Sequence, residues 1–433
     1  MIMFSLNKDN CLSGLQWFFF IFCNTVVIPP TLQSAFHLSD ATTLTITQYA
    51  FLATSVACLI QAIAGHKRSI MEGPAGLWWG TILSVTFAES AQGTPLEVIG
   101  GSFAVGIAIA GIITVIIGIS GAGKYLALLF SPGVMAVFMF LLGANLITIF
   151  LKGMLGLPFS ATTDIVHINF ETFLLALFIM AIIIAIIVLL PRNINKYAVL
   201  IGSILGWFLF LILFRSESTV SNSINWQLFP LGKIETINYG IVVTCIIASL
   251  LNTSNTFGAI KGTDMFNPET PSTPAMYKRS FITSGTMTFI CSPLGIVPFA
   301  PFVSSIGLIT QTNDFSKKPF VIGSIFFLII SLVPILSSLF SSFPLVISST
   351  VMMVTYLPLL WSSLLFIRIL ELNPRNIYRL ALPLFIGIFL MSVPPTYMQD
   401  IPLMIRPIVT NGLLMGIIIS IILENIFKWD AVK

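Results

Sequence analysis

Charged residues are scarce in this chain of 433 residues. Lys, Arg, Asp and Glu together account for 8% of the sequence, whereas 56% is hydrophobic, and the mean hydropathy is +1.00. Because a soluble domain carries about 25% charged residues, this composition indicates an integral membrane protein. The net charge of +4 is scattered and includes no basic run of the kind that binds nucleic acid, so no nucleic-acid partner is expected.

Motifs for metal, cofactor or catalytic chemistry are also lacking. The five cysteines occur singly with no CxxC spacing, and the three histidines form no ligand pair. The stretch GISGAGKY (118–125) resembles a phosphate loop but has Tyr125 where such a loop needs Ser or Thr. No HExxH or GxSxG occurs. We therefore expect no enzyme activity, no metal and no cofactor.

Long apolar runs fill most of the chain, and each can cross a bilayer as a helix. The first begins near Leu12 and is expected to be a helix and not a signal peptide. The predicted segments are 12–34, 46–65, 73–90, 98–119, 126–150, 171–190, 197–214, 239–260, 279–295, 299–312, 319–339, 343–365, 378–393 and 407–427. The fold class is thus an all-α polytopic membrane protein with 14 transmembrane segments.

Two of these segments, 73–90 and 299–312, are short and begin at or directly after a Gly or Pro, and each is the third in its half of seven. Matched short segments of this kind indicate inverted repeats with a binding site at their interface. In 297–312, VPFAPFVSSIGLITQT, two prolines precede Phe302, Val303 and Ser304, so an extended stretch is expected before a half-helix. Such backbone is tolerated at membrane depth only where it lines a cavity.

The distribution of Lys and Arg between the loops gives the orientation. With a cytoplasmic N-terminus, sixteen of the 20 Lys and Arg residues fall inside, and only Lys152, Arg215, Lys233 and Arg406 fall outside. This strong positive-inside bias predicts a multi-pass protein of the plasma (inner) membrane with both termini cytoplasmic.

Glu72 is an unusual carboxylate, because it stands directly before Gly-Pro-Ala-Gly in SIMEGPAGLWWG (69–80). Two interpretations remain open from the residues alone. It could lie at the water interface and pair with Lys67 or Arg68, or it could lie at a substrate site where the segment is unwound. In the second half, Asn252, Asn255 and Thr256 share one helix face.

Four stretches resemble the nucleobase–ascorbate transporter family (nucleobase:cation symporter 2), and the likeness covers most of the chain. LQWFFFIFCNTVVIPP (15–30) resembles the family's first helix, with its Gln at Gln16 and its Pro at Pro29. ACLIQAIAGHKRSIMEGPAGL (57–77) resembles the second helix and the start of the third, and FSPGVMAVFMFLLGANL (130–146) resembles the fifth. FVSSIGLITQT (302–312) resembles the family signature and keeps its Gly307 and Thr312.

The resemblance implies two inverted repeats of seven segments, with short antiparallel strands in segments 3 and 10. In this alignment the strand of segment 3 is expected to run from Gly73 to Leu77, directly after Glu72. It implies a core domain formed by residues 12–120 (segments 1–4) and 238–340 (segments 8–11), and a gate domain formed by 121–237 (segments 5–7) and 341–433 (segments 12–14). It also implies a planar nucleobase held between these domains, and a homodimer through the gate domain.

The sequence departs from the family at three site positions. The usual acid of segment 8 is replaced by Asn255, and the Glu or Gln and the Asn of segment 10 are replaced by Ser304 and Ser305. We therefore expect Glu72 to have taken over the lost carboxylate role, with Glu89 as the other candidate for proton coupling. The expected substrate-binding residues are Glu72, Gly73, Ala75, Gly76, Leu77, Asn255, Thr256, Phe302, Val303, Ser304 and Ser305.

The function expected from the resemblance is import of a nucleobase, a purine more readily than a pyrimidine, by a secondary-active transporter. The coupling ion is expected to be a proton, or else sodium, and lipid surrounds the chain. Alternatives are an anion transporter or exchanger of the same fold, and a sensor-like paralogue that does not transport.

Overall fold

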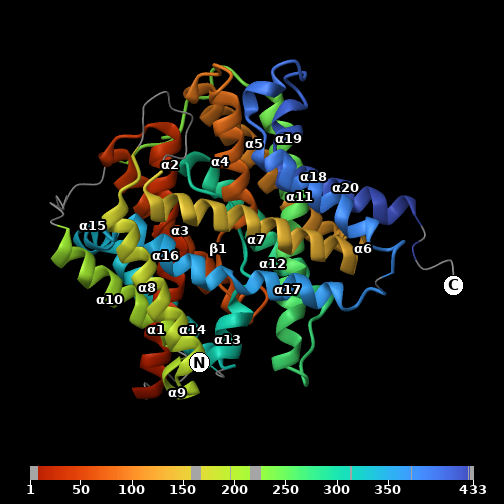
Figure 1. The fold of residues 1–433 in the computed structure, drawn as a ribbon. Helices are drawn as coiled ribbons and strands as arrows, with labels where there is room; N and C mark the ends of the chain where they lie inside the picture. The colour runs from red at the N-terminus through yellow and green to blue at the C-terminus, as the bar shows by residue number, and fades with distance from the viewer. Residues whose placement is uncertain are drawn as a thin grey trace.

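The computed structural model describes residues 8–157, 167–195, 197–214, 226–312, 315–371, 373–427 and 429. The described chain is mostly helical, and Figure 1 shows the helices arranged around the short strand β1 near the centre of the molecule. Of the charged residues used to predict the orientation, four lie outside the described ranges: Lys196, Arg215, Lys428 and Lys433.

The elements of the first part of the chain run from the N-terminus to the middle. They are α1 (Lys8–Val26), α2 (Ile28–Phe36), α3 (Asp40–Ile63), β1 (Glu72–Pro74), α4 (Gly76–Ser90), α5 (Leu96–Ser120), α6 (Gly123–Leu129), α7 (Pro132–Leu155), α8 (Phe170–Leu189), α9 (Arg192–Asn195) and α10 (Ala198–Leu213).

The second part contains the other strand. Its elements are α11 (Tyr239–Gly262), η1 (Thr263–Phe266), α12 (Pro274–Leu294), β2 (Phe299–Pro301), α13 (Ser305–Thr312), α14 (Lys317–Leu332), α15 (Pro334–Ser341), α16 (Leu345–Tyr356), α17 (Pro358–Ile367), α18 (Tyr378–Ser392), η2 (Pro395–Met398), α19 (Arg406–Val409) and α20 (Gly412–Ile426).

Seven helices of the described chain are long and apolar enough to cross a membrane, and a bent pair would make an eighth. That pair, α14 and α15, turns by 102° at Val333, because the following Pro334 has no N–H to donate and restricts the residue before it. Three shorter apolar helices are α10, α18 and α20. Several predicted segments are therefore built from a short or broken helix, including 73–90, which consists of β1 and α4.

Two groups of helices pack closely. In the first, α1 packs against α14, and α5 packs against α11 and α12; in the second, α7 packs against α16, α17 and α20. Glycine permits a close approach between α5 and α12: a Cβ on Gly111 would lie 2.6 Å from the backbone nitrogen of Phe289. Such small residues let membrane helices gain van der Waals contact at short range.

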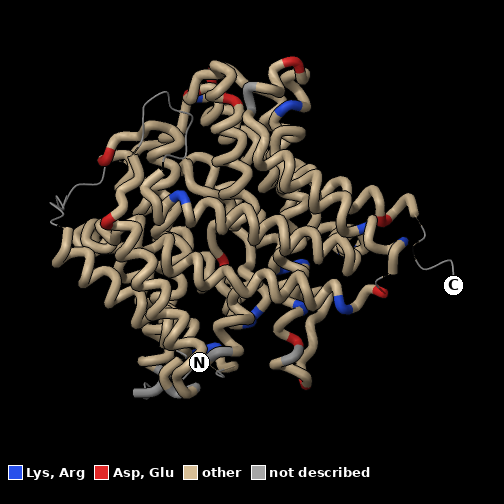
Figure 2. The backbone as a smooth tube through the Cα atoms, in the orientation of Figure 1, with Lys and Arg blue, Asp and Glu red and all other residues tan. Residues whose placement is uncertain are grey.

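Charged positions are unevenly distributed over this fold. Figure 2 shows many Lys and Arg positions in the half of the molecule nearer the labelled N-terminus, and few charged positions of either sign in the middle. A carboxylate in the middle of the molecule needs a cation or hydrogen-bond donors, or a bound proton, because burying a charge without a partner is costly.

Candidate functional site

The two strands meet where the third and tenth predicted segments are unwound. Residues 72–74 pair in antiparallel register with residues 301–299, and all six are buried. Backbone bonds extend the pair at both ends, from Ala75 N to the Pro298 carbonyl (2.8 Å) and from Phe302 N to the Met71 carbonyl (2.8 Å). The strands stay short because Pro74 and Pro301 cannot donate to a ladder.

Each strand leads into a short helix. The expected strand over Gly73 to Leu77 is wrong in its extent, because β1 ends at Pro74 and α4 begins at Gly76 with Ala75 as its extended N-cap. After β2, α13 begins at Ser305. The first backbone N–H groups of a helix have no partner within it, so the starts of α4 and α13 both carry partial positive charge.

A small pocket lies beside these helix starts, with a volume of about 30 Å³. It lies between the strand region and helices α7, α16 and α17. Its lining residues are Ala75, Gly76, Met139, Leu142, Leu146, Asn255, Ala300, Pro301, Phe302, Val303, Ser304, Tyr356 and Leu359. This is about the volume that one water molecule occupies in liquid water, so in this conformation the pocket is too small for a nucleobase.

Three side chains supply most of the polarity of this pocket. Asn255 donates to Asn252 Oδ1 (2.9 Å), and Asn252 in turn donates to the Phe299 carbonyl of β2 (3.3 Å). Across the pocket, the Tyr356 hydroxyl donates to Asn24 Oδ1 (3.0 Å) and lies next to the Ser304 hydroxyl. The remaining side chains are mostly apolar, and no described residue that lines the pocket is charged.

The Glu72 side chain does not line this pocket and instead lies next to side chains of α3 and α12. Its side chain is fully buried, and its Oε2 accepts a hydrogen bond from Gln61 Nε2 (3.0 Å). The same Gln61 nitrogen lies 3.3 Å from Ser280 Oγ and 3.2 Å from Ser284 Oγ of α12. Among the described residues Glu72 forms no ion pair, and Arg68 bonds Asp264 instead. The interface interpretation of Glu72 is therefore wrong.

The other predicted binding residues divide between the pocket and its supports. Six line it: Ala75, Gly76, Asn255, Phe302, Val303 and Ser304. Ser305 instead accepts a hydrogen bond from Met71 N (3.0 Å), so it fastens α13 to the chain entering β1. Thr256 lines a separate cavity of about 10 Å³ that also contacts Ser284. Gly73 and Leu77 are buried but do not line the pocket.

Glu89, at the far end of α4, forms a fully paired ionic site. It accepts hydrogen bonds from Arg406 Nε (2.8 Å) and Nη2 (2.7 Å), and both side chains are buried. Asn238 and Thr94 also donate to it. This bidentate pair joins α4 to α19, 317 residues away in sequence.

Some residues that line the pocket could not have been predicted from the sequence. Met139, Leu142, Leu146 and Leu359 are indistinguishable from other apolar helix residues until α7 and α17 are placed against the strands. Tyr356 could have been singled out, because it closes α16 two residues before Pro358, where the apolar run must break.

The sequence profile of the Permease family (Xan_ur_permease) matches residues 8–396. The chain belongs to this family. Because the match covers most of the chain, the resemblance to nucleobase–ascorbate transporters is confirmed, and the chain is a divergent member. It is a transporter and not an enzyme, and it is a multi-pass membrane protein.

Two relatives illustrate the range of the family. "Putative purine permease YwdJ" of Bacillus subtilis (strain 168) is 26% identical over 438 residues, which span 98% of this chain and 97% of that protein. Xanthine permease XanP of Escherichia coli (strain K12) is 24% identical over 308 residues, which span 69% of this chain and 65% of XanP. Both names describe purine-base permeases, and the family implies a small-molecule nucleobase substrate.

Solved structures with the same fold include transporters of other substrates. The transmembrane domain of the cyanobacterial bicarbonate transporter BicA matches with a TM-score of 0.59 at 13% identity, over 96% of this chain and 98% of that domain. The murine anion transporter Slc26a9 in its inward-facing state matches with a TM-score of 0.58 at 13% identity, over 98% of this chain and 69% of that one. At this identity the likeness concerns the fold alone.

Proposed function

We propose that this transporter imports a nucleobase, preferentially a purine, by proton symport with alternating access. The observation that carries the proposal is the character of the pocket at the strand pair. Apolar side chains from α7 and α17 face a few polar groups at Asn255, Ser304 and Tyr356. A flat heteroaromatic base has apolar faces and polar edges, which match such a lining.

Anion transport is the second candidate function, because one observation favours it. The starts of α4 and α13 both lie at the pocket, and helix N-termini bind anions readily. The same N–H groups can equally bind the carbonyl oxygens of an uncharged base. The five apolar side chains of Met139, Leu142, Leu146, Phe302 and Leu359 favour the base, since they would offer no hydrogen bond to a small oxyanion.

The proposed architecture has fourteen segments in two inverted repeats, divided into core and gate. The helix packing supports this division. Contacts of α1 with α14 and of α5 with α11 and α12 lie within the proposed core, whereas those of α7 with α16, α17 and α20 lie within the proposed gate. The pocket receives residues from both groups, as a site that opens alternately to either side requires.

In the structure the pocket is too small to hold a base, and alternating access would begin from this closed conformation. The Glu89–Arg406 pair joins the proposed core to the proposed gate on the side predicted to face outward. Opening to that side would separate α4 from α19 and so break the pair. The pocket, at about 30 Å³, must widen in the same movement to admit a base.

Glu72 is proposed to carry the coupled proton. It is fully buried and is held by Gln61 together with Ser284, with no cation bonded to it among the described residues. Because an ionised carboxylate is costly to bury without a counter-charge, binding a proton stabilises Glu72 in this place. Its backbone belongs to β1, opposite Pro301 of the pocket, so its protonation and substrate binding act on the same strands.

A ligand screen on the purified protein tests the proposed function. Purines, pyrimidines, bicarbonate and sulfate would be compared for their effect on the melting temperature in one buffer. The proposal predicts saturable stabilisation by purines at concentrations where the anions have no effect. Stabilisation by an anion and by no base would favour anion transport. If no compound raised the melting temperature, even under conditions that hold the protein in one conformation, the sensor-like paralogue that does not transport would be favoured.

A further inference from the structure

A second pocket, separate from the one at the strands, lies on the face predicted to be cytoplasmic. Its volume is about 220 Å³, several times the share of a water molecule. It lies between the loop that enters β1, the end of α11 with η1, the half-helix α13 and the start of α14. Its lining residues are Lys67, Arg68, Ser69, Thr263, Phe266, Asn267, Ile309, Phe315, Ser316 and Lys317.

The charge of this pocket has one sign. Lys67, Arg68 and Lys317 all line it, and none of the described residues that line it is acidic. Lys67 and Lys317 are exposed, so each can direct its ammonium group toward a bound molecule. Three cations around one pocket raise the local concentration of anions.

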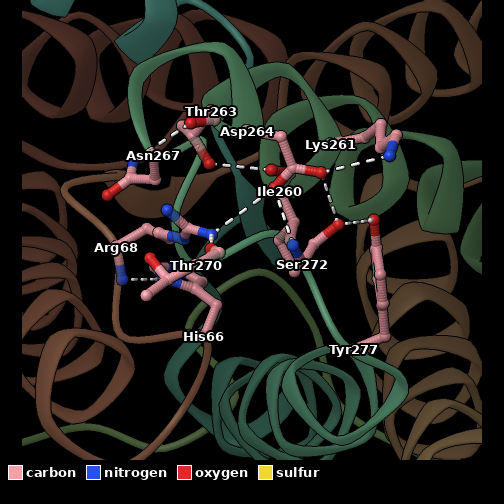
Figure 3. A network of polar contacts seen from close by, with 10 residues as sticks. All are labelled: His66, Arg68, Ile260, Lys261, Thr263, Asp264, Asn267, Thr270, Ser272 and Tyr277. Carbon is pink, nitrogen blue, oxygen red and sulfur yellow. Dashed lines mark hydrogen bonds and ion pairs between the residues drawn. The ribbon is translucent and has the colours of Figure 1, made fainter.

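Arg68 is the buried member of this group. Its side chain is 6% exposed, and its Nη2 contacts Asp264 Oδ1 (3.4 Å) and the Thr270 carbonyl, as Figure 3 shows. Its Nη1 is buried and has no hydrogen-bond partner among the described residues. A buried guanidinium nitrogen without a partner is unfavourable, so this atom indicates an acceptor that binds there.

Asp264 does not neutralise the pocket. Burial alone would raise the pKa of Asp264, but hydrogen bonds from Ser272 and Lys261 and the charge of Lys261 together lower the pKa below its ordinary value. The ionised carboxylate is therefore shared between Arg68 and Lys261, whose Nζ lies 3.1 Å from Asp264 Oδ2. Figure 3 shows this carboxylate directed toward Lys261 and Ser272, with Arg68 reaching it from the other side.

The start of α14 adds backbone donors to the same pocket. This helix of 16 residues begins at Lys317, and its N-cap Ser316 makes no side-chain capping bond. The Ser316 carbonyl instead accepts a hydrogen bond from Ser69 Oγ (3.1 Å), which fixes the loop before β1 against the helix. The N-terminal end of a helix is a favourable place for an oxyanion.

We propose that this pocket binds a phosphate group, either as a free phosphate or phosphomonoester or as the headgroup of an acidic lipid. The bound group would accept from Arg68 Nη1 and from Lys67 and Lys317 at the start of α14. It would thereby connect the loop that enters β1 to α14. The proposal does not depend on which base, if any, is transported.

The test is thermal unfolding of the purified full-length protein in neutral detergent, titrated with inorganic phosphate at constant ionic strength. Wild type should show a saturable rise in melting temperature. The double variant Lys67→Gln/Lys317→Gln should weaken phosphate binding by about tenfold or more, since each charged hydrogen bond contributes on that scale. The matched control Lys278→Gln/Lys318→Gln removes two exposed cations of the same face that do not line the pocket, and should bind as wild type does.

A second arm of the test distinguishes the sources of the phosphate. The same three proteins would be placed in phosphatidylcholine nanodiscs with or without phosphatidic acid. Stabilisation by phosphatidic acid that Lys67→Gln/Lys317→Gln alone abolishes assigns the pocket to lipid; stabilisation by inorganic phosphate with the same pattern assigns it to a free ligand. If neither probe stabilises wild type, or if all three proteins respond equally, the proposal is wrong.

Discussion

Glu72 is the residue on which the proposed proton coupling depends. Its carboxylate is buried behind β1 and hydrogen-bonded to Gln61, with no ion pair among the described residues. The alternative is a purely structural role, in which the carboxylate only fastens β1 to α3 and α12. The two roles differ in how transport responds to pH.

The first prediction concerns Glu72→Gln. The amide can still accept from Gln61, so melting temperature and membrane insertion should stay close to wild type. Uptake should fall by about tenfold or more and should no longer rise when the outside is more acidic than the inside. Glu97→Gln, which removes an exposed acid at the start of α5, is the control and should keep wild-type pH dependence. A Glu72→Gln protein that still accumulates base in response to a pH gradient would show that the proton is carried elsewhere.

Tyr356 gives the second prediction, because its hydroxyl is one of few polar groups at the pocket. Tyr356→Phe removes the bond to Asn24 Oδ1 (3.0 Å) and the contact with Ser304 while keeping the ring. Base affinity should fall by roughly three- to tenfold, the effect of one neutral hydrogen bond. Equilibrium binding measures this, with Tyr397→Phe at an exposed position as control. Unchanged affinity would place the base away from Tyr356.

At the scale of elements, the broken segments are the part that the sequence predicts best. Glycine and proline at 73–76 and proline at 301 mark where a helix cannot continue, so the strand pair could be placed to within a few residues. The end of β1 was misplaced, because Ala75 is extended but already caps α4. Whether such a residue pairs or caps depends on the neighbouring chain, which the local sequence does not contain.

The third prediction concerns the contact between α5 and α12. Gly111→Ala places a Cβ 2.6 Å from the Phe289 backbone nitrogen and 2.9 Å from the Gly285 carbonyl, so the helices must separate. The melting temperature should drop by several degrees, as overpacking costs typically 1–3 kcal/mol. Gly307→Ala, in α13, meets no atom within 4 Å and should be neutral or slightly stabilising. Equal melting temperatures for the two variants would contradict the close packing.

At the scale of the whole molecule, long-range partners are what the sequence could not predict. Glu89 was a candidate for proton coupling, yet the structure pairs it with Arg406, and nothing in either local sequence indicates the other. Likewise, Glu72 could be identified as unusual, but its burial depends on how α3 and α12 meet around Gln61 and Ser284. Depth and partner are properties of the assembled helices.

The fourth prediction treats Glu89 and Arg406 as a contact that closes the outward side. Glu89→Gln/Arg406→Gln removes both charges together, which avoids leaving one buried alone. Without the pair, the outward-open population should rise severalfold. The rate of maleimide labelling of a cysteine introduced at Ser84, in the cavity between α4 and α20, measures this.

The control for this labelling experiment is the other buried bidentate pair, Arg379–Glu424, which lies within the proposed gate. Arg379→Gln/Glu424→Gln should leave labelling at Ser84→Cys unchanged. Both pairs would be tested in a background with Cys11 replaced by Ser, since the other native cysteines are buried. If removing either pair changed the labelling rate alike, the Glu89–Arg406 pair would have no specific role in closing the outward side.

Proton-coupled purine import is tested most directly by uptake of radiolabelled xanthine or hypoxanthine into proteoliposomes containing the purified protein. An inwardly directed proton gradient is imposed, and the same vesicles are assayed with bicarbonate and sulfate. Proton-coupled purine import predicts saturable purine accumulation that collapses when the gradient is dissipated, with no comparable anion uptake. Gradient-independent anion uptake without any purine accumulation would contradict it.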